Sequence, residues 1–590
     1  MSGDAPALTP RALERRLAEL AAGDGAFSAA QLAELDRREA FPAAACAALD
    51  DAGLPGYYVP ARHGGRLARY PDLIELWRAV ARRDLTVAVA HGKTLLGTIG
   101  VWLAGSPEQA AWLGREVMAG AVVAWGLTER GHGSDLLAGE LTATRTATGW
   151  RLDGEKWLIN NATRGHVVAV LARTVPAGGP RGFSLILVDK RRLAPGSHRC
   201  LPRELTHGIR GADISGIALA GAEVPADALV GKVGEGIQTV LLGLQLTRTT
   251  CVGLSLGAAE HALRLAVDFA AEHRLYDRRL IELPRARRTL GEAAGALLVA
   301  EAVSAVAGRS VHALTGELSV ISAITKALVP TLVDGLIAQL AELLGARAFL
   351  TEVHASGSFA KLERDHRIMA IFDGSTVVNR SALINQFPLL ARAARAGRCD
   401  PAGLAAATTL TAALPALDPG RLALIASGCT VVQGVPAAVA AIRDRASSGR
   451  VSPAIAAMAG ALGDAAAALQ AELAATVPTP RDVPASAFTL AARYELCFAG
   501  AACLEIWLRN AELAAASDPG ATGDAAAATA AALWRDALWL EAALRQVLER
   551  LGAAPGPEGA RVHDRLADVV AAAPWPAAFS LLAAIPGEAP

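Results

Sequence analysis

A single carboxylate, Asp373, stands in the apolar segment Ile368–Thr376, directly before Gly374. The segment lies deep in a region whose apolar residues recur with helical spacing. A carboxyl group in apolar surroundings acquires a raised pKa, which suits it to remove a weakly acidic proton near neutral pH. An isolated Asp-Gly pair is more often a simple turn. Asp373 is therefore a candidate general base, with a turn as the alternative.

A second segment, Leu127–Asp135, is rich in glycine, with Gly131 and Gly133 beside His132 and Ser134. Glycines allow backbone amides to approach an anion closely, so the segment suits a phosphate group. The alternative is a glycine turn that leads into a β-strand.

The elements that must position these segments are mostly helical. Only 4% of the residues are aromatic while 52% are hydrophobic, and alanine is abundant, which favours closely packed helices. Between two helical regions, Leu141–Val188 alternates apolar and polar residues and contains Asp153-Gly154, which we expect to form a hairpin turn. Three apolar runs are expected to be strands: 166–171, 183–188 and 214–219.

These patterns predict four parts along the 590 residues. The expected parts are an N-terminal helical domain (1–120), a small β-domain (121–232), a helical bundle (233–395) and an alanine-rich helical extension (396–590).

The bulk composition argues against several classes of function. Lys+Arg and Asp+Glu both number 57, so no charge imbalance favours binding to nucleic acid. The seven cysteines are scattered and never spaced as Cys-x-x-Cys, which suggests neither a zinc site nor a disulfide framework. The N-terminus lacks the continuous apolar stretch of a secretory signal, and long apolar runs are interrupted, so we expect a cytoplasmic protein without a membrane span.

Taken together, the two segments resemble the paired signatures of the acyl-CoA dehydrogenase family. Leu127–Asp135 is similar to the family's Thr-Glu-Pro-Gly-x-Gly-Ser-Asp element, with Arg130 in place of the proline. The resemblance implies that Thr128 faces the ring of an FAD cofactor and that Ser134 lies near its phosphates. Leu127 and Gly133 are implied as further cofactor contacts.

The segment 154–161 resembles the family's Gly-x-Lys-x-Trp-Ile-Thr-Asn strand, which packs against the flavin. Leu158 takes the position of the aromatic residue. Asn160 takes that of the hydroxyl residue near flavin N5, where its amide can donate a hydrogen bond. Trp157 is either a substitute aromatic wall or an ordinary buried tryptophan.

Two further matches concern phosphate contacts made across a subunit boundary. The segment 273–277 resembles Arg-x-x-Phe-Gly, whose arginine reaches the FAD pyrophosphate of a neighbouring subunit. We favour Arg274 over His273 for this role because a guanidinium is always charged and binds phosphate bidentately. The turn 345–349 resembles Gly-Gly-x-Gly-Phe and implies that Gly345 also meets the partner subunit's FAD. A surface charge at a helix end is the alternative for Arg274.

The segment 364–375 resembles the family's Arg-Asp-x-x-x-x-x-Ile-Tyr-Glu-Gly-Thr pattern, with Asp373 at the position of the catalytic glutamate and one methylene shorter. The resemblance implies that Asp373 removes the proton α to a thioester, with Gly374 in substrate binding and Ser375 in cofactor binding. Arg248 matches an arginine near the active site, and Thr247 before it offers no alternative carboxylate. The shorter side chain predicts a reduced rate or an altered substrate.

The resemblance implies a mostly α fold, with an N-terminal helical domain, a central small β-barrel domain, a C-terminal four-helix bundle and an extra helical domain like that of very-long-chain acyl-CoA dehydrogenases and acyl-CoA oxidases. The implied function is FAD-dependent α,β-dehydrogenation of an acyl thioester of CoA or a carrier protein. The implied assembly is a homodimer or tetramer that uses no metal and passes electrons to electron-transfer flavoprotein or another acceptor. A flavin oxidase or monooxygenase of the same fold and a helical scaffold without flavin are the alternatives.

Overall fold

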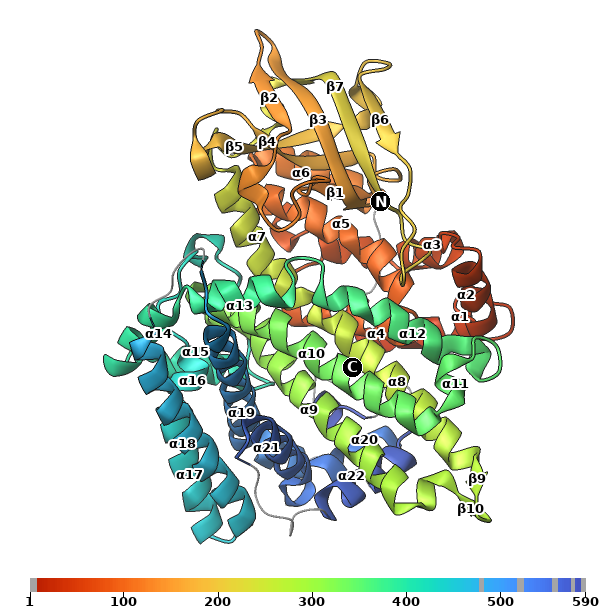
Figure 1. Ribbon diagram of the computed structural model, residues 1–590, viewed down its shortest axis with the longest axis vertical. Helices are drawn as coiled ribbons and strands as arrows, with labels where there is room; N and C mark the ends of the chain where they lie inside the picture. The colour runs from red at the N-terminus through yellow and green to blue at the C-terminus, as the bar shows by residue number, and fades with distance from the viewer. Residues whose placement is uncertain (1–7, 477–481, 517–524, 554–560, 575–578, 585–590) are drawn as a thin grey trace. The chain divides into compact units, whose positions relative to one another are not determined.

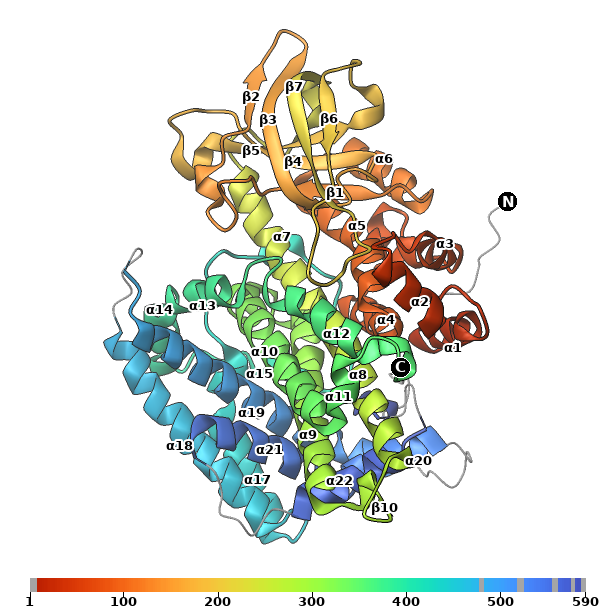
Figure 2. The same ribbon diagram turned by 45° about the vertical axis from the view of Figure 1, so that its right-hand side comes forward.

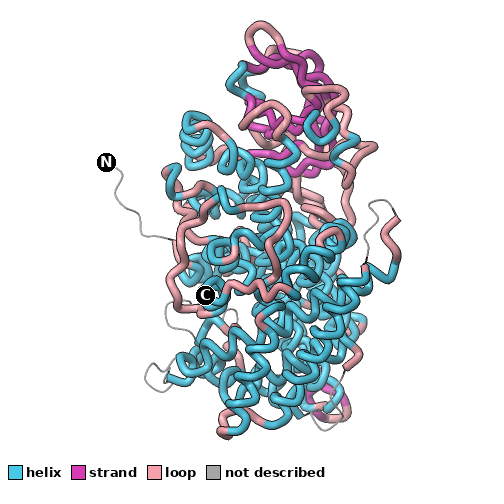
Figure 3. The backbone as a smooth tube through the Cα atoms, turned by 90° about the vertical axis from the view of Figure 1, so that its left-hand side faces the viewer, coloured by secondary structure: helices cyan, strands magenta, loops and turns pink. Residues whose placement is uncertain are grey.

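The computed structural model describes residues 8–476, 482–516, 525–553, 561–574 and 579–584 (Figure 1). The chain divides into two compact units. The first unit comprises 1–68 and 84–247, and the second comprises 69–83 and 248–590. Most strands gather in one region of the chain, a short strand pair lies apart from them, and helices make up most of the rest (Figure 3). The expected mostly α fold with a central β-domain is confirmed.

Four helices of the first unit, α1, α2, α5 and α6, begin at polar caps. The side chains of Thr9, Ser28, Asp84 and Ser106 each accept a hydrogen bond from the amide three residues later, which satisfies one otherwise unpaired donor. The helices of the first unit are α1 (Pro10–Ala21), α2 (Ala29–Arg37), α3 (Ala43–Asp51), α5 (Leu85–Ala104), α6 (Pro107–Met118) and most of α7 (Gly236–Thr250).

The first unit also holds an eight-stranded sheet with the order β6-β7-β3-β2-β4-β5-β8, in which β1 pairs with β4 in parallel. Buried side chains such as Trp150, Leu152, Val170 and Ile217 form its core. The strands are β1 (Val123–Gly126), β2 (Thr142–Arg145), β3 (Gly149–Asn160), β4 (Val167–Arg173), β5 (Phe183–Asp189), β6 (His198–Leu201), β7 (Ile214–Pro225) and β8 (Leu229–Val230). The three expected strands are confirmed as β4, β5 and β7.

The expected hairpin turn at Asp153-Gly154 is wrong. Both residues lie inside β3, where the pairing with β7 shifts register between Leu152 and Gly154. Gly154 has φ +134°, and a Cβ there would meet Leu141 Cα at 2.8 Å. Asp153 accepts a hydrogen bond from the amide of Gly221 at 2.7 Å. A β-bulge needs the same permissive backbone as a turn, so the residue pair alone does not separate the two.

The second unit is built around the 30-residue helix α9 (Pro284–Ala313), which packs on α4, α8 and α10. Helix α4 comes from the N-terminal part of the chain but packs here against α8. The remaining elements before the extension are α4 (Tyr70–Arg83), α8 (Val252–Glu272), β9 (Arg274–Leu275), β10 (Arg278–Arg279), α10 (Leu318–Leu344), α11 (Ala346–Phe349), α12 (Ser358–His366), α13 (Thr376–Ile384) and α14 (Phe387–Arg395).

The C-terminal extension belongs to the second unit and is helical. Helices α17 and α18 lie side by side, and α19 packs on α9, α13 and α21 (Figures 1 and 2). The extension contains α15 (Pro401–Thr408), α16 (Thr430–Gln433), α17 (Val435–Ser447), α18 (Pro453–Ala475), α19 (Ala485–Ala516), α20 (Ala525–Trp534), α21 (Leu538–Leu551) and α22 (Arg561–Ala572).

Among the described residues, six helices are long and apolar enough to cross a membrane by length and composition alone. In four of them more than four-fifths of the apolar stretch is buried inside the protein. Packing against neighbouring helices accounts for the apolar character of these four.

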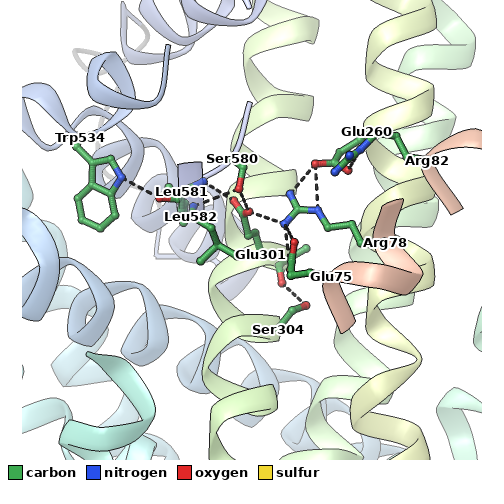
Figure 4. A network of polar contacts seen from close by, with 11 residues as sticks. Glu75, Arg78, Arg82, Glu260, Glu301, Ser304, Trp534, Ser580, Leu581 and Leu582 are labelled. Carbon is green, nitrogen blue, oxygen red and sulfur yellow. Dashed lines mark hydrogen bonds and ion pairs between the residues drawn. The ribbon is translucent and has the colours of Figure 1, made fainter. Parts of the chain in front are cut away.

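A buried network of charges joins α4, α8, α9 and the C-terminal segment (Figure 4). Arg78 donates to Glu260 at 2.5 Å, to Glu301 at 2.7 Å and to Glu75 at 3.2 Å. Arg82 donates to Glu260, and Glu301 also accepts from Ser580 Oγ and the amide of Leu581. Three carboxylates thus face two guanidinium groups. Burial raises the pKa of Glu75 to about 7, opposed by Arg78 and reinforced by Glu301 and Glu260.

This raised pKa predicts that Glu75 makes stability depend on pH. The folded state holds the Glu75 proton up to about pH 7, whereas the unfolded state loses it near its ordinary pKa of 4.5. The free energy of unfolding therefore falls as pH rises between these values. We expect Glu75→Gln, which cannot lose this proton, to match the wild type at acidic pH and to exceed it by about 1–3 kcal/mol at pH 8.

Denaturant unfolding over a range of pH measures this effect. Asp72→Asn is the matched control, because Asp72 lies on the same helix and its side chain is 40% exposed beside Arg69. Equal pH slopes for the wild type and Glu75→Gln would contradict the assignment.

Candidate functional site

The Asp373 loop has an unusual backbone. Asp373 has φ +55° and Gly374 has φ +91°, directly before Ser375, which caps α13 by accepting from the amide of Val378. A positive φ is costly for an aspartate and persists where its surroundings impose it. Arg248 Nε donates to the carbonyl of Asp373 at 2.8 Å. Cys251 Sγ donates to Asp373 Oδ2 at 3.5 Å.

Gly374 lies against Arg248. A Cβ at Gly374 would come within 2.8 Å of Arg248 Nη2. The structure therefore brings Arg248, from α7, against the loop that contains Asp373, Gly374 and Ser375, although the two segments are distant in sequence.

Arg248 is buried, and burial lowers the pKa of its guanidinium to about 10, against the opposite influence of Asp373. It stays protonated at neutral pH. Thr247 before it is fully buried and its hydroxyl turns back to the carbonyl of Leu244. A positive charge thus lies beside the half-buried carboxylate.

Two buried side chains, Lys326 and His366, fix the segment 366–372 that leads into the Asp373 loop. Lys326 Nζ donates to the carbonyl of Met369 at 2.5 Å and lies 4.9 Å from the ring centre of Phe372. His366 bonds to Asp334 Oδ1 at 2.7 Å and to Ser255 Oγ at 3.0 Å. The carboxylate is therefore presented by a segment that is fixed at several points.

In the first unit, Thr128 lies beside the edge of β3. Its hydroxyl donates to the carbonyl of Trp157 at 2.7 Å, and its own carbonyl accepts from the Trp157 amide at 3.0 Å. Leu158 has φ +58° at a register shift of β3, and its side chain is 44% exposed. The amide of Asn160 is buried, and neither its nitrogen nor its oxygen has a partner. Thr128, Leu158 and Asn160 are thus close along one edge.

The glycine loop is anchored by a buried ion pair. Lys156 Nζ bonds to Glu129 Oε1 at 2.7 Å and to the carbonyl of Leu127 at 3.0 Å. Glu129 also accepts from the amides of Glu140 and Leu141. Burial raises the pKa of Glu129, but the hydrogen bonds from Lys156 and these amides outweigh it and lower the pKa.

The rest of that loop is open. Gly133 and Ser134 are exposed, and a Cβ at Gly133 would meet nothing within 4 Å. Arg130, which replaces the family's proline, lies 4.6 Å from the ring centre of Trp157. The indole nitrogen of Trp157 donates to Glu204 at 2.6 Å. Trp157 is half-buried between these two groups.

Arg274 and Gly345 lie at the other end of α8. Arg274 is exposed, whereas His273 stacks on Phe269 at 4.7 Å between ring centres. Gly345 ends α10 with φ +57°, and Arg347 in the following turn lies 5.2 Å from the same Phe269 ring. The 21 residues of α8 separate this end from the Asp373 loop by about 30 Å.

Three contributors were not predicted from the sequence. Cys251 touches the Asp373 carboxylate, and Asn379 Nδ2 donates to the carbonyls of Gly374 and Ser375. Glu129 pairs with Lys156, and the sequence patterns do not predict this pair. The available signal is that one motif, 127–135, contains a glutamate and the other, 154–161, contains a lysine.

Three stretches of the chain match the N-terminal, middle and C-terminal domains of acyl-CoA dehydrogenase, at residues 17–120, 124–221 and 234–387. The matches cover more than half of the chain. The chain belongs to the acyl-CoA dehydrogenase family. Members of this family depend on FAD.

Among its relatives, a probable acyl-CoA dehydrogenase of Mycobacterium tuberculosis is 27% identical over 353 residues, which span 59% of this chain and 88% of the relative. A solved structure described as an electron transferring flavoprotein of Acidaminococcus fermentans shares 21% identity with a TM-score of 0.59 and covers 65% of this chain and 98% of its own. An acyl-CoA dehydrogenase of Bacillus anthracis, solved with FAD, shares 18% identity with a TM-score of 0.65 and covers 95% of this chain and 93% of its own. The similarity of fold to the Bacillus anthracis structure therefore includes the C-terminal helical extension of the present chain.

The residues of the first unit fit a flavin. The unpartnered Asn160 amide offers both a donor and an acceptor to a polar ring edge, and the exposed Leu158 offers an apolar surface beside it. The open glycine loop at Gly133 leaves backbone amides accessible to phosphate. Membership in the family and the fold support acyl-CoA dehydrogenation as the class of reaction.

Proposed function

We propose that this protein is an FAD-dependent acyl-thioester dehydrogenase in which Asp373 removes the α-proton as the double bond forms. The observation that carries this proposal is the half-buried Asp373 side chain, presented from a positive-φ loop beside Arg248 and Cys251. When bound, FAD supplies the acceptor for the β-hydride. Thr128, Leu158 and Asn160 would hold the ring, and Gly133 and Ser134 the phosphates.

The chain's own groups account for the proton step. Loss of the α-proton turns the thioester carbonyl toward an enolate, which needs a base and nearby positive charge or donors. Asp373 supplies the base at Oδ1 or Oδ2. The buried guanidinium of Arg248 stays charged, and its bond to the Asp373 carbonyl fixes the loop against the last turn of α7. A rigid presentation matters because proton transfer loses efficiency steeply with misplacement.

We further propose that the protein works as a homo-oligomer. Arg274 and Gly345 lie about 30 Å along α8 from the Asp373 loop, too far to serve a ligand bound there in the same chain. Tyr276 and Phe349 beside them are 88% and 87% exposed, which suits contact with a second copy. A single-subunit mass in sedimentation equilibrium would contradict this proposal.

Cytoplasmic location and transfer of electrons to electron-transfer flavoprotein or another acceptor are further parts of the proposed function.

Anaerobic titration of the purified yellow protein with acyl thioesters tests the proposed function. The panel contains short, medium and long saturated acyl groups on CoA and on carrier protein. We expect at least one thioester to bleach the visible flavin band and to be recovered as its α,β-unsaturated product. A product hydroxylated only in the presence of oxygen would indicate a monooxygenase. Purification without flavin would indicate the non-catalytic scaffold.

A further inference from the structure

The Asp373 loop is attached to a short helix. Helix α13 has nine residues, too few to be stable without packing, and its cap residue Ser375 follows Asp373 by two positions. Asn379 in α13 is fully buried and donates to the carbonyls of Gly374 and Ser375 at 2.8 and 3.0 Å. The position of the Asp373 carboxylate therefore depends on where α13 is held.

The next residue after Asn379 connects α13 to the C-terminal extension. Arg380 Nε donates to Glu495 Oε1 at 2.9 Å, and Arg380 Nη2 donates to Glu495 Oε2 at 2.8 Å. This is a bidentate pair, which fixes direction as well as distance. Side-chain exposure is 22% for Arg380 and 1% for Glu495, so water screens the pair weakly.

Glu495 comes from a part of the chain outside the matched family domains. It lies about a third of the way along the 32-residue helix α19, whereas the last family match ends at residue 387. Helix α19 packs on α13, α10 and α9. The extension thus packs a long helix against α13, the helix that directly follows the Asp373 loop.

We propose that Glu495 is a positioning residue for the Asp373 loop and acts through Arg380 and α13. This inference rests on the proposed role of Asp373 as the base. Loss of the Glu495 charge leaves Arg380 without its partner and lets α13 shift. Asp373 is one methylene shorter than glutamate, so its carboxylate has little reach to spare. A small displacement of the loop would therefore take the carboxylate away from the α-carbon of the thioester.

The test compares Glu495→Gln with Glu505→Gln. Glu505 is a second buried carboxylate on α19, and it pairs within the helix to Arg509 at 3.1 Å. We expect Glu495→Gln to slow anaerobic flavin reduction by about 10–100-fold, with little change in the thioester concentration that gives half-maximal rate. Glu505→Gln is expected to leave both quantities unchanged. Arg380→Lys, which keeps the charge but not the bidentate geometry, is expected to fall between them.

Hydrogen exchange provides a readout that does not require turnover. We expect the amides of Val378 and Asn379, which donate to Ser375, to exchange about tenfold faster in Glu495→Gln, and in Glu505→Gln to exchange as in the wild type. Faster exchange in Glu495→Gln, together with a wild-type protein that no thioester reduces, would support the positioning of α13 by Glu495. The same result would overturn the proposed function. Unchanged exchange and unchanged reduction in a folded Glu495→Gln would overturn the positioning role. Equal losses in both variants, or failure of Glu495→Gln and Arg380→Lys to fold while Glu505→Gln folds, would also overturn it.

Discussion

Asp373→Asn is expected to slow reduction of the flavin by a saturated acyl thioester by about 10²–10⁴-fold. Asparagine keeps the size and the polar contact to Cys251 but cannot accept a proton from carbon. The backbone bond from Arg248 and the helix cap at Ser375 do not involve the replaced atoms, so the loop should keep its shape. Stopped-flow absorbance under anaerobic conditions measures the rate, and the flavin content of the purified variant checks that the cofactor is still bound.

Asp373→Glu is the informative partner to this variant. The extra methylene extends the carboxylate by about 1.5 Å, the length of one carbon–carbon bond. We expect this variant to stay active and to shift its preference among acyl chains, because the base then meets the α-carbon at a different depth. Reduction of Asp373→Asn at the wild-type rate would show that another group removes the proton.

The periodicity of apolar residues predicted most of the fold. Helical spacing of apolar residues marked the long helices, and the runs at 166–171, 183–188 and 214–219 formed strands. These signals depend only on residues that are close in sequence, so they can be recognised without knowledge of tertiary contacts. The pair Asp153-Gly154 shows their limit, because a bulge inside β3 and a hairpin turn use the same residues.

The candidate site was predictable only where its residues lie in ordered motifs. Arg248 and Asp373 stand 125 positions apart in sequence, and their contact was expected from resemblance alone. Cys251 has no motif of its own, and its thiol reaches Asp373 because α7 gives way to α8 at that residue. Glu495 lies beyond the matched domains, so nothing local in α19 marks it as the partner of Arg380. Such contacts depend on the packing of helices that are far apart in sequence.

Breaking the buried ion pair of Lys156 and Glu129 should lower the stability of the first unit more than any other substitution proposed there. Lys156 is 1% exposed, so Lys156→Met leaves the Glu129 carboxylate buried without its cation, at a cost of about 3–5 kcal/mol. Glu129→Leu should cost at least as much, because it also strands the amides of Glu140 and Leu141.

Arg151→Met is the matched control for this pair, since Arg151 lies on the same strand and pairs with Asp153 at an exposed position, where a loss within about 1 kcal/mol is expected. Denaturant unfolding followed by tryptophan fluorescence measures the stabilities. Since Glu129 anchors the loop that begins at Thr128, we also expect both buried-pair variants to retain less flavin on gel filtration than Arg151→Met. Stability and flavin content equal to those of the control would mean that the loop is held by its other contacts, and that the ion pair uniting the two motifs does not organise the cofactor edge.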